Sequence, residues 1–345
     1  MEDRSIRLDG KPDAALHIST FFPAPSSCEP FTHTLVVFLN GLALPRSSWK
    51  AAVDHFIDLR QQTGKPIPSL VSYDRYGQGD SDPDPTDDAG QLPYGHDPHA
   101  VTADLHRLLL HLCEHDDHLK IPSIEDMSIV FVCNSIGCAL ARLYAQEHPG
   151  LVAGYLFLDS MMANTDFVSL FPDPDEPGFD EKKLPTGVTA DGLRHAREMC
   201  AKMFHPTVPN GEHLDRRKLP DVLPYADRPA LPPGPNGKAP RLVVVGHDWD
   251  EFAKQCENGH MDVPKAVINA YMNPAWGAYN EGLTRLTENP GRDGKKEDVK
   301  IANGCGHFIQ RDDPIFVATE IGSLLEDLAR EQLESTGRNE SVSEL

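Results

Sequence analysis

Residues 128–150 constrain the fold more than any other stretch, because a buried strand runs into a helix there with almost no loop between them. Positions 129–132 are four consecutive apolar residues, which is typical of a strand buried on both faces of a parallel sheet. From Ile136 onward apolar residues recur at spacings of three and four, which predicts an amphipathic helix that stops at Pro149 and Gly150. Residues 133–137 must therefore make the turn, and they place Ser135 on a sharp bend.

A serine on this bend has chemical consequences. It is expected above the carboxyl edge of the sheet, where the free N–H groups and the dipole of the helix face any developing oxyanion. The stretch resembles the nucleophile elbow of the α/β-hydrolase family, whose pattern is Gly-x-Ser-x-Gly. Gly137 occupies the second glycine position, and Cys133 stands where the first is expected. The alternative is a serine that only caps a core helix.

Composition excludes several classes of protein. The net charge of −21 disfavours a nucleic acid or an anionic membrane as partner. We expect a soluble, cytoplasmic protein, because no apolar leader and no stretch of membrane-spanning length is found in the sequence. Seven cysteines without paired spacing fit reduced thiols better than disulfides. A small-molecule substrate is the expected partner, and the oligomeric state stays open.

Strand and helix patterns alternate along most of the chain, which predicts an α/β fold with a mostly parallel, doubly wound sheet. Apolar strand patterns occur at 34–39, 70–73, 129–132, 155–158, 241–245 and 298–302, and weaker ones at 5–8 and 15–22 could form an antiparallel edge. Between 161 and 239 we find one good helix, capped by Thr189, and no strong strand. This segment resembles the helical cap that many α/β-hydrolases carry. We expect a core of residues 1–160 and 240–334, a cap of 161–239 and a flexible tail of 335–345.

The resemblance extends to two further junctions between strands and loops. Asn40, Gly41 and Leu42 follow the strand at 34–39, where the family commonly carries His-Gly and a main-chain oxyanion donor. The resemblance therefore implies that the N–H groups of Leu42 and Ile136 form the oxyanion hole. Residues 74–81 match the family turn Asp-x-x-Gly-x-Gly-x-Ser, which we interpret as a structural brace beside the site.

A serine nucleophile needs a base and an acid that fixes the tautomer of the base. The resemblance assigns the base to His307, after the final strand, and the acid to Asp248, after the strand at 241–245. Asp250 and Asp159 remain alternatives for the acid, since Asp159 ends the strand where some family members carry theirs. His247 is the rival base, but as the neighbour of Asp248 it should point to the other side.

The resemblance implies acyl transfer to water without a metal or organic cofactor. A serine at the elbow argues against haloalkane dehalogenases and epoxide hydrolases, whose nucleophile is a carboxylate. We predict a serine hydrolase that cleaves an ester or lactone of a small, largely apolar molecule, with Asn40, Asn134 and Met161 near the substrate. Thioesters, amides and carbon–carbon bonds use the same triad and stay open. A catalytically weak ligand-binding protein is the other alternative, and Cys133 is among the departures that support it.

Three histidines at helical spacing raise the question of a metal site. His111, His115 and His118 fall on one helical face with Glu114 nearby, a spacing that metal ligands can use. Because no fourth ligand or motif accompanies them, we favour a solvated polar face and predict no metal.

Overall fold

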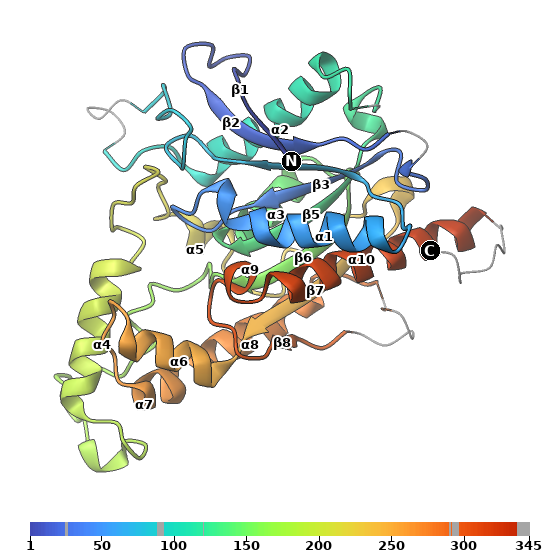
Figure 1. Ribbon diagram of the computed structural model, residues 1–345. Coiled ribbons are helices and arrows are strands. Elements are labelled where there is room, and N and C mark those ends of the chain that lie inside the picture. The colour runs from blue at the N-terminus through green and yellow to red at the C-terminus, as the bar shows by residue number, and fades with distance from the viewer. Residues whose placement is uncertain (25–26, 88–92, 120, 290, 292–296, 337–345) are drawn as a thin grey trace.

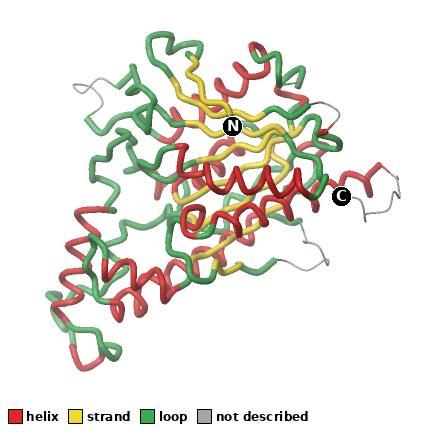
Figure 2. The backbone as a smooth tube through the Cα atoms, viewed as in Figure 1, coloured by secondary structure: helices red, strands yellow, loops and turns green. Residues whose placement is uncertain are grey.

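An eight-stranded sheet runs through the computed structural model, which describes residues 1–24, 27–87, 93–119, 121–289, 291 and 297–336 (Figures 1 and 2). The strand order is β1-β2-β4-β3-β5-β6-β7-β8. Only the pairs that involve β2 are antiparallel, and the remaining pairs are parallel. The strands are β1 (Glu2–Ile6), β2 (Leu16–Phe21), β3 (Thr34–Leu39), β4 (Ser69–Tyr73), β5 (Ser128–Ser135), β6 (Val152–Ser160), β7 (Arg241–His247) and β8 (Lys300–Ala302).

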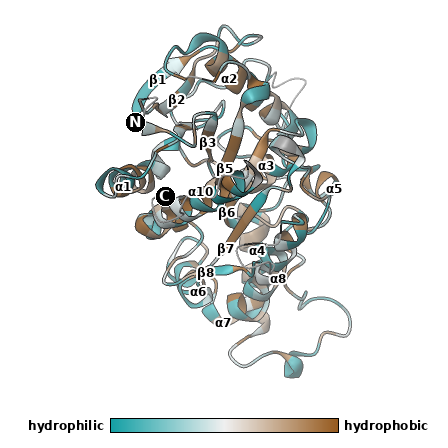
Figure 3. Cartoon of the chain, turned by 90° about the vertical axis from the view of Figure 1, so that its right-hand side faces the viewer, coloured by the Kyte–Doolittle hydropathy of each residue, from teal (hydrophilic) through white to brown (hydrophobic). Residues whose placement is uncertain are grey.

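Helices cover both faces of the sheet, as the doubly wound fold requires. The 3-10 turn η2 (Arg46–Trp49), α1 (Lys50–Gln62), α9 (Ile309–Asp312) and α10 (Pro314–Thr336) pack on one face, and α2 (Pro98–His115), α3 (Ile136–Glu147) and α8 (Asn273–Leu283) pack on the other. Alternate residues of β3 enter the two cores, with Val36 and Phe38 on the α1 side and Val37 on the α3 side. Figure 3 shows the apolar strands enclosed by these helices.

The predicted fold class is confirmed. Each of the six strong strand patterns contains a strand, and the weaker pattern at 15–22 forms β2 of an antiparallel edge. The other edge strand, β1, lies earlier than the pattern at 5–8 and overlaps it only at Ser5 and Ile6. The closing helix continues to Thr336, and residues 337–345 of the predicted tail lie outside the described residues. Among the described residues, no helix is both long enough and apolar enough to cross a bilayer.

Residues 161–240 form an insertion between β6 and β7 that adds no strand to the sheet. Its helical elements are η4 (Glu181–Lys183), α4 (Ala190–Met203), α5 (Leu219–Val222) and η5 (Pro235–Gly237). The Thr189 side chain accepts a hydrogen bond from the Gly192 N–H, so it caps α4 as predicted. α4 contacts α7 (Lys265–Val267), and Figure 1 shows it beside α6 (Trp249–Asn258) and α7, away from the N-terminal strands.

Candidate active site

Ser135 is the last residue of β5, and α3 begins at the next residue. Its backbone has φ 56° and ψ −123°, a combination that is strained for a residue other than glycine and that is found at functional sites. A side chain at Gly137 would place its Cβ 2.4 Å from the Leu39 carbonyl oxygen. Only glycine therefore lets the first turn of α3 approach β3 this closely. The strand, turn and helix predicted for this stretch are present.

Asp159 is the carboxylate that meets the predicted base. Its Oδ2 lies 2.6 Å from His307 Nδ1, and its side chain is fully buried near the carboxyl end of β6. β6 is the neighbour of β5, so the ends of the two strands carry Ser135 and Asp159 side by side in the sheet. Burial alone would raise the pKa of Asp159, but the charge of His247 and hydrogen bonds from His247 and His307 lower it to about 2.

The assignment of the acid to Asp248 is contradicted by this geometry. Asp248 caps α6: its Oδ1 accepts hydrogen bonds from two N–H groups of the first turn, and its Oδ2 accepts one from the Gly304 N–H at 3.0 Å. The alternative assignment of the acid to Asp250 is also wrong, because the exposed Asp250 carboxylate forms an ion pair with Lys265. The remaining alternative, Asp159, is the carboxylate hydrogen-bonded to His307.

His247, the rival base, is fully bonded inside the protein. It is the last residue of β7 and is 2% exposed. Its Nδ1 lies 2.9 Å from Asp159 Oδ1, and its Nε2 lies 3.1 Å from Asn273 Oδ1. Since both ring nitrogens face hydrogen-bond acceptors, neither can take a proton from Ser135.

Asn40 is a structural residue and not a substrate contact. It is 1% exposed, and its amide nitrogen donates to the Tyr73 carbonyl and to Gln78 Oε1 at 2.8 and 2.9 Å. Its Oδ1 accepts a hydrogen bond from the Trp49 indole at 2.7 Å. These bonds fix the loop after β3, which contains the predicted oxyanion donor Leu42.

A buried ion pair braces the same loop. Arg75 donates to the carbonyl oxygens of Asn40 and Gly41 at 2.9 and 3.0 Å, and it forms a two-point pair with Glu212. Glu212, which comes from the insertion, also accepts a hydrogen bond from the Ala43 N–H at 2.8 Å. The predicted bracing role of residues 74–81 is therefore confirmed. Sequence reasoning missed Glu212, which no local pattern marks.

The braced loop lies against Ser135. A Cβ added at Gly41 would be 3.4 Å from the Cβ of Ser135 and 3.0 Å from Asn134 Oδ1. Leu42, the next residue, is half-buried, and its N–H makes no hydrogen bond with any described residue. Ile136 is the first residue of α3, so its N–H has no partner within that helix.

The prediction that Asn134 contacts the substrate is also wrong, because the residue is completely buried. Its amide nitrogen donates to the carbonyl oxygens of Leu158 and His307, both at 3.0 Å, and its Oδ1 accepts from Gln310 at 3.2 Å. The Asn134 side chain therefore holds the main chain of His307 next to Ser135.

Aromatic and apolar side chains surround the base. The Trp276 indole donates to the Ser160 carbonyl at 2.8 Å, and its ring meets the His307 ring edge-on, with centroids 5.2 Å apart. Met161 lines a small cavity of about 10 Å³ between the end of β6 and the insertion, together with Phe167 and Phe204. A contact between Met161 and substrate stays a prediction.

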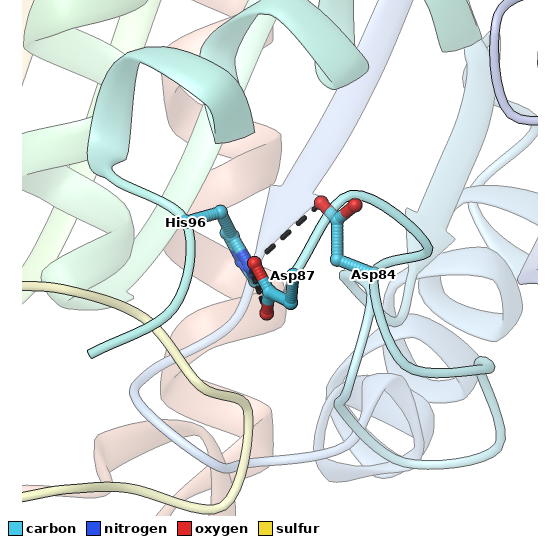
Figure 4. A group of neighbouring side chains, drawn as sticks. All are labelled: Asp84, Asp87 and His96. Atoms are coloured by element: carbon cyan, nitrogen blue, oxygen red, sulfur yellow. Dashed lines mark hydrogen bonds and ion pairs between the residues drawn. The ribbon is translucent and has the colours of Figure 1, made fainter. Parts of the chain in front are cut away.

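Figure 4 shows a second cluster, in which Asp84, Asp87 and His96 place potential ligand atoms within 4.8 Å of one another. Lys11 already provides a cation here, since its ammonium group lies 2.5 Å from Asp84 Oδ2. His96 Nδ1 and His213 Nδ1 lie 3.0 and 3.2 Å from Asp87 Oδ2. We interpret the cluster as an ion-pair network that joins the loop after β4 to the insertion.

Fold and site together define a hydrolase, and the chain belongs to the alpha/beta hydrolase family, whose profile matches residues 36–320. A thermophilic esterase from Thermogutta terrifontis has a similar structure, with 16% identity and a TM-score of 0.52 over 95% of this chain and 100% of that chain. Proline iminopeptidase from Mycobacterium smegmatis is similar with 13% identity and a TM-score of 0.51, over 96% and 100%. The epoxide hydrolase VrEH1 from Vigna radiata is similar with 13% identity and a TM-score of 0.50, over 94% and 98%. No curated protein matches the chain in sequence.

Proposed function

We propose that this enzyme is a serine hydrolase that cleaves an ester or lactone of a small, largely apolar molecule. Ser135 is the nucleophile, His307 the base and Asp159 the acid. The observation that carries the proposal is the 2.6 Å hydrogen bond between His307 and Asp159, at the end of the strand beside the strained Ser135. A serine that only capped the α3 helix would require neither the Asp159 carboxylate nor the His307 imidazole.

The hydrogen bond to Asp159 selects the tautomer of the base. A carboxylate with a pKa of about 2 is ionised at neutral pH and only accepts, so His307 Nδ1 carries the proton. The lone pair is then on Nε2, the nitrogen that the triad uses to accept the serine proton. The Ser135 hydroxyl has no hydrogen bond with any described residue.

The main-chain amides supply the electrostatic part of catalysis. We assign the oxyanion hole to the N–H groups of Leu42 and Ile136, since the first has no partner among the described residues and the second begins a helix. The dipole of α3 adds a partial positive charge at the same point. Because Arg75 and Asn40 hold the Leu42 loop, the donors are fixed before the substrate binds.

The reaction follows from these positions. His307 takes the Ser135 proton as Oγ attacks the carbonyl carbon, and the two amides stabilise the tetrahedral oxyanion. Protonated His307 then gives its proton to the departing alkoxide, which leaves an acyl group on Ser135. Water, deprotonated by His307, attacks this acyl group, and Ser135 is released with its proton restored. Asp159 remains ionised throughout and stabilises the imidazolium.

The side chains around the base favour an apolar acyl group. Trp276 and Phe308 both contact the His307 ring, with centroids 5.2 and 5.0 Å away. The small cavity beside Met161 is also lined by Phe167 and Phe204, which adds further apolar side chains at the end of β6. The net charge of −21 fits a small-molecule substrate and no nucleic acid partner. Thioesters, amides and carbon–carbon bonds would follow the same steps, and a substrate screen separates them.

A fluorophosphonate probe tests the proposal, because it reacts with a serine only when a base and an oxyanion hole activate the hydroxyl. We expect stoichiometric labelling of the wild type at Ser135, read by intact mass and peptide mapping. Ser135→Ala should abolish labelling, and Asp250→Asn, an exposed residue of α6, should label like the wild type. A folded wild type that stays unlabelled while an ester ligand raises its melting temperature would instead support a ligand-binding protein.

A further inference from the structure

Asp159 is shared by two imidazoles, although a serine triad needs only one. Its Oδ2 faces His307, while its Oδ1 lies 2.9 Å from His247 Nδ1 and 3.3 Å from the His247 main-chain nitrogen. His247 is 2% exposed and Asp159 is fully buried. The second histidine is therefore not a surface neighbour, and its protonation state affects the charge of the whole site.

The side-chain amide of Asn273 determines whether Nε2 of His247 donates or accepts a hydrogen bond. Asn273 Nδ2 lies 2.9 Å from the Trp249 carbonyl oxygen, and a carbonyl can only accept. The amide nitrogen must therefore point there, so Asn273 Oδ1 points at His247 Nε2, 3.1 Å away. Nε2 has to donate to this oxygen, just as Nδ1 has to donate to the Asp159 carboxylate. A neutral imidazole has only one N–H, so it cannot satisfy both acceptors.

We propose that His247 is a positioning residue: a buried imidazolium that donates one hydrogen bond to Asp159 and one to Asn273, and so fixes the carboxylate that orients His307. The protonation state rests on the geometry of His247 alone. The effect on catalysis rests in addition on the proposed triad.

The surroundings of His247 favour the cation. Phe252 of α6 stacks on its ring with centroids 4.2 Å apart, and Trp276 of α8 meets it edge-on at 5.5 Å. The charged or titratable groups that act on it are Asp159 from β6, Asp248 at the end of its own strand, and His307 across the Asp159 carboxylate. Burial alone would lower the pKa of His247, but the charge of Asp159 and hydrogen bonds to Asp159 and Asn273 outweigh it and raise the pKa.

The raised pKa of His247 determines how the stability of the fold depends on pH and which charge His247 places near His307. The His247–Asp159 pair stabilises the fold fully below the unfolded-state histidine pKa of about 6.5, and this stability is lost as the pH rises through the higher pKa of the folded protein. In catalysis, a positive charge on His247 opposes a second positive charge on His307.

Nuclear magnetic resonance of the protein labelled with ¹⁵N-histidine tests the protonation state without any assay of activity. We expect both ring nitrogens of His247 to carry protons at pH 7.5, where a histidine with an ordinary pKa is about nine-tenths neutral. The signals are assigned by their loss in His247→Asn. A bare ring nitrogen on His247 at pH 7.5 overturns the proposal, whether or not the protein hydrolyses any ester.

The pH–rate profile tests the effect on the base. His247→Asn keeps a neutral donor near Asp159 but removes the charge, so the acidic limb of kcat/KM should move to higher pH by about one unit. Phe252→Leu is the matched control, since it disturbs the packing of the His247 ring and leaves the charge in place, and its acidic limb should stay with the wild type. An unmoved limb in His247→Asn contradicts the electrostatic role. If His247→Asn fails to fold, the His247 signals are assigned in the wild type by nuclear Overhauser effects to the stacked Phe252 ring, and the spectrum still decides the proposal.

Discussion

Asp159→Asn is expected to lower kcat on the order of 10⁴-fold, the loss that follows when the acid of a serine triad becomes an amide. The amide nitrogen of asparagine would face His307 Nδ1, which then has to accept. The proton moves to Nε2, and the imidazole can no longer take the proton of Ser135. Steady-state kinetics on the ester that screening identifies measures this loss.

Asp248→Asn is the matched comparison for this prediction. The substitution is the same, the residue also follows a core strand, and asparagine caps a helix about as well as aspartate does. We expect its kcat/KM to stay within about threefold of the wild type, because Asp248 contacts the α6 N-terminus and Gly304 and not the base. A severe loss in Asp248→Asn together with an active Asp159→Asn would return the acid to Asp248.

Circular dichroism has to accompany both variants. Asp159→Asn leaves the His247 imidazolium without its carboxylate, so some loss of thermal stability is expected with the loss of activity. The catalytic interpretation needs a variant that remains folded at the assay temperature.

The fold was predictable because its signals are local. Buried parallel strands read as continuous apolar runs such as residues 34–39, and the helix after Ser135 shows its period over twelve residues. The elbow was predictable for the same reason, since strand, turn and helix are contiguous in the chain. His307 could be selected from the sequence because it comes shortly after the last strand.

The carboxylate that pairs with His307 was not predictable, because it depends on where β7 ends. The apolar pattern ends β7 at Val245, whereas the strand runs to His247. Side chains alternate between the two sides of a strand, so this extension determines which of His247 and Asp248 faces Asp159. His247 turns inward and Asp248 becomes the cap of α6. Glu212 was missed for another reason: it meets Arg75 across 137 positions of sequence, from a segment without helical or strand periodicity.

The pair of Arg75 and Glu212 leads to the second prediction. Both side chains are almost completely buried, with exposed fractions of 3% and 0%. Arg75→Met leaves the Glu212 carboxylate buried without its counter-charge, and we expect the free energy of unfolding to fall by about 3–5 kcal/mol. Urea unfolding followed by circular dichroism measures the change. Arg194→Met removes an exposed ion pair with Asp175 and should leave the unfolding midpoint nearly unchanged.

The double variant Arg75→Met/Glu212→Gln separates the cost of an unpaired charge from the value of the pair. Because it leaves no uncompensated charge, its loss of stability should be well below the sum of the two single losses. We also expect the loss of Arg75 to lower kcat, and the double variant should not restore kcat as it restores stability. Without Arg75 the Asn40 carbonyl oxygen loses its donor and the Gly41 carbonyl oxygen keeps only Gln78. Without the Glu212 carboxylate the Ala43 N–H loses its charged acceptor. Leu42, the proposed oxyanion donor, lies between these anchors, so kcat should stay low in the double variant even when stability is regained. Equal recovery of both quantities would show that the pair contributes to folding only.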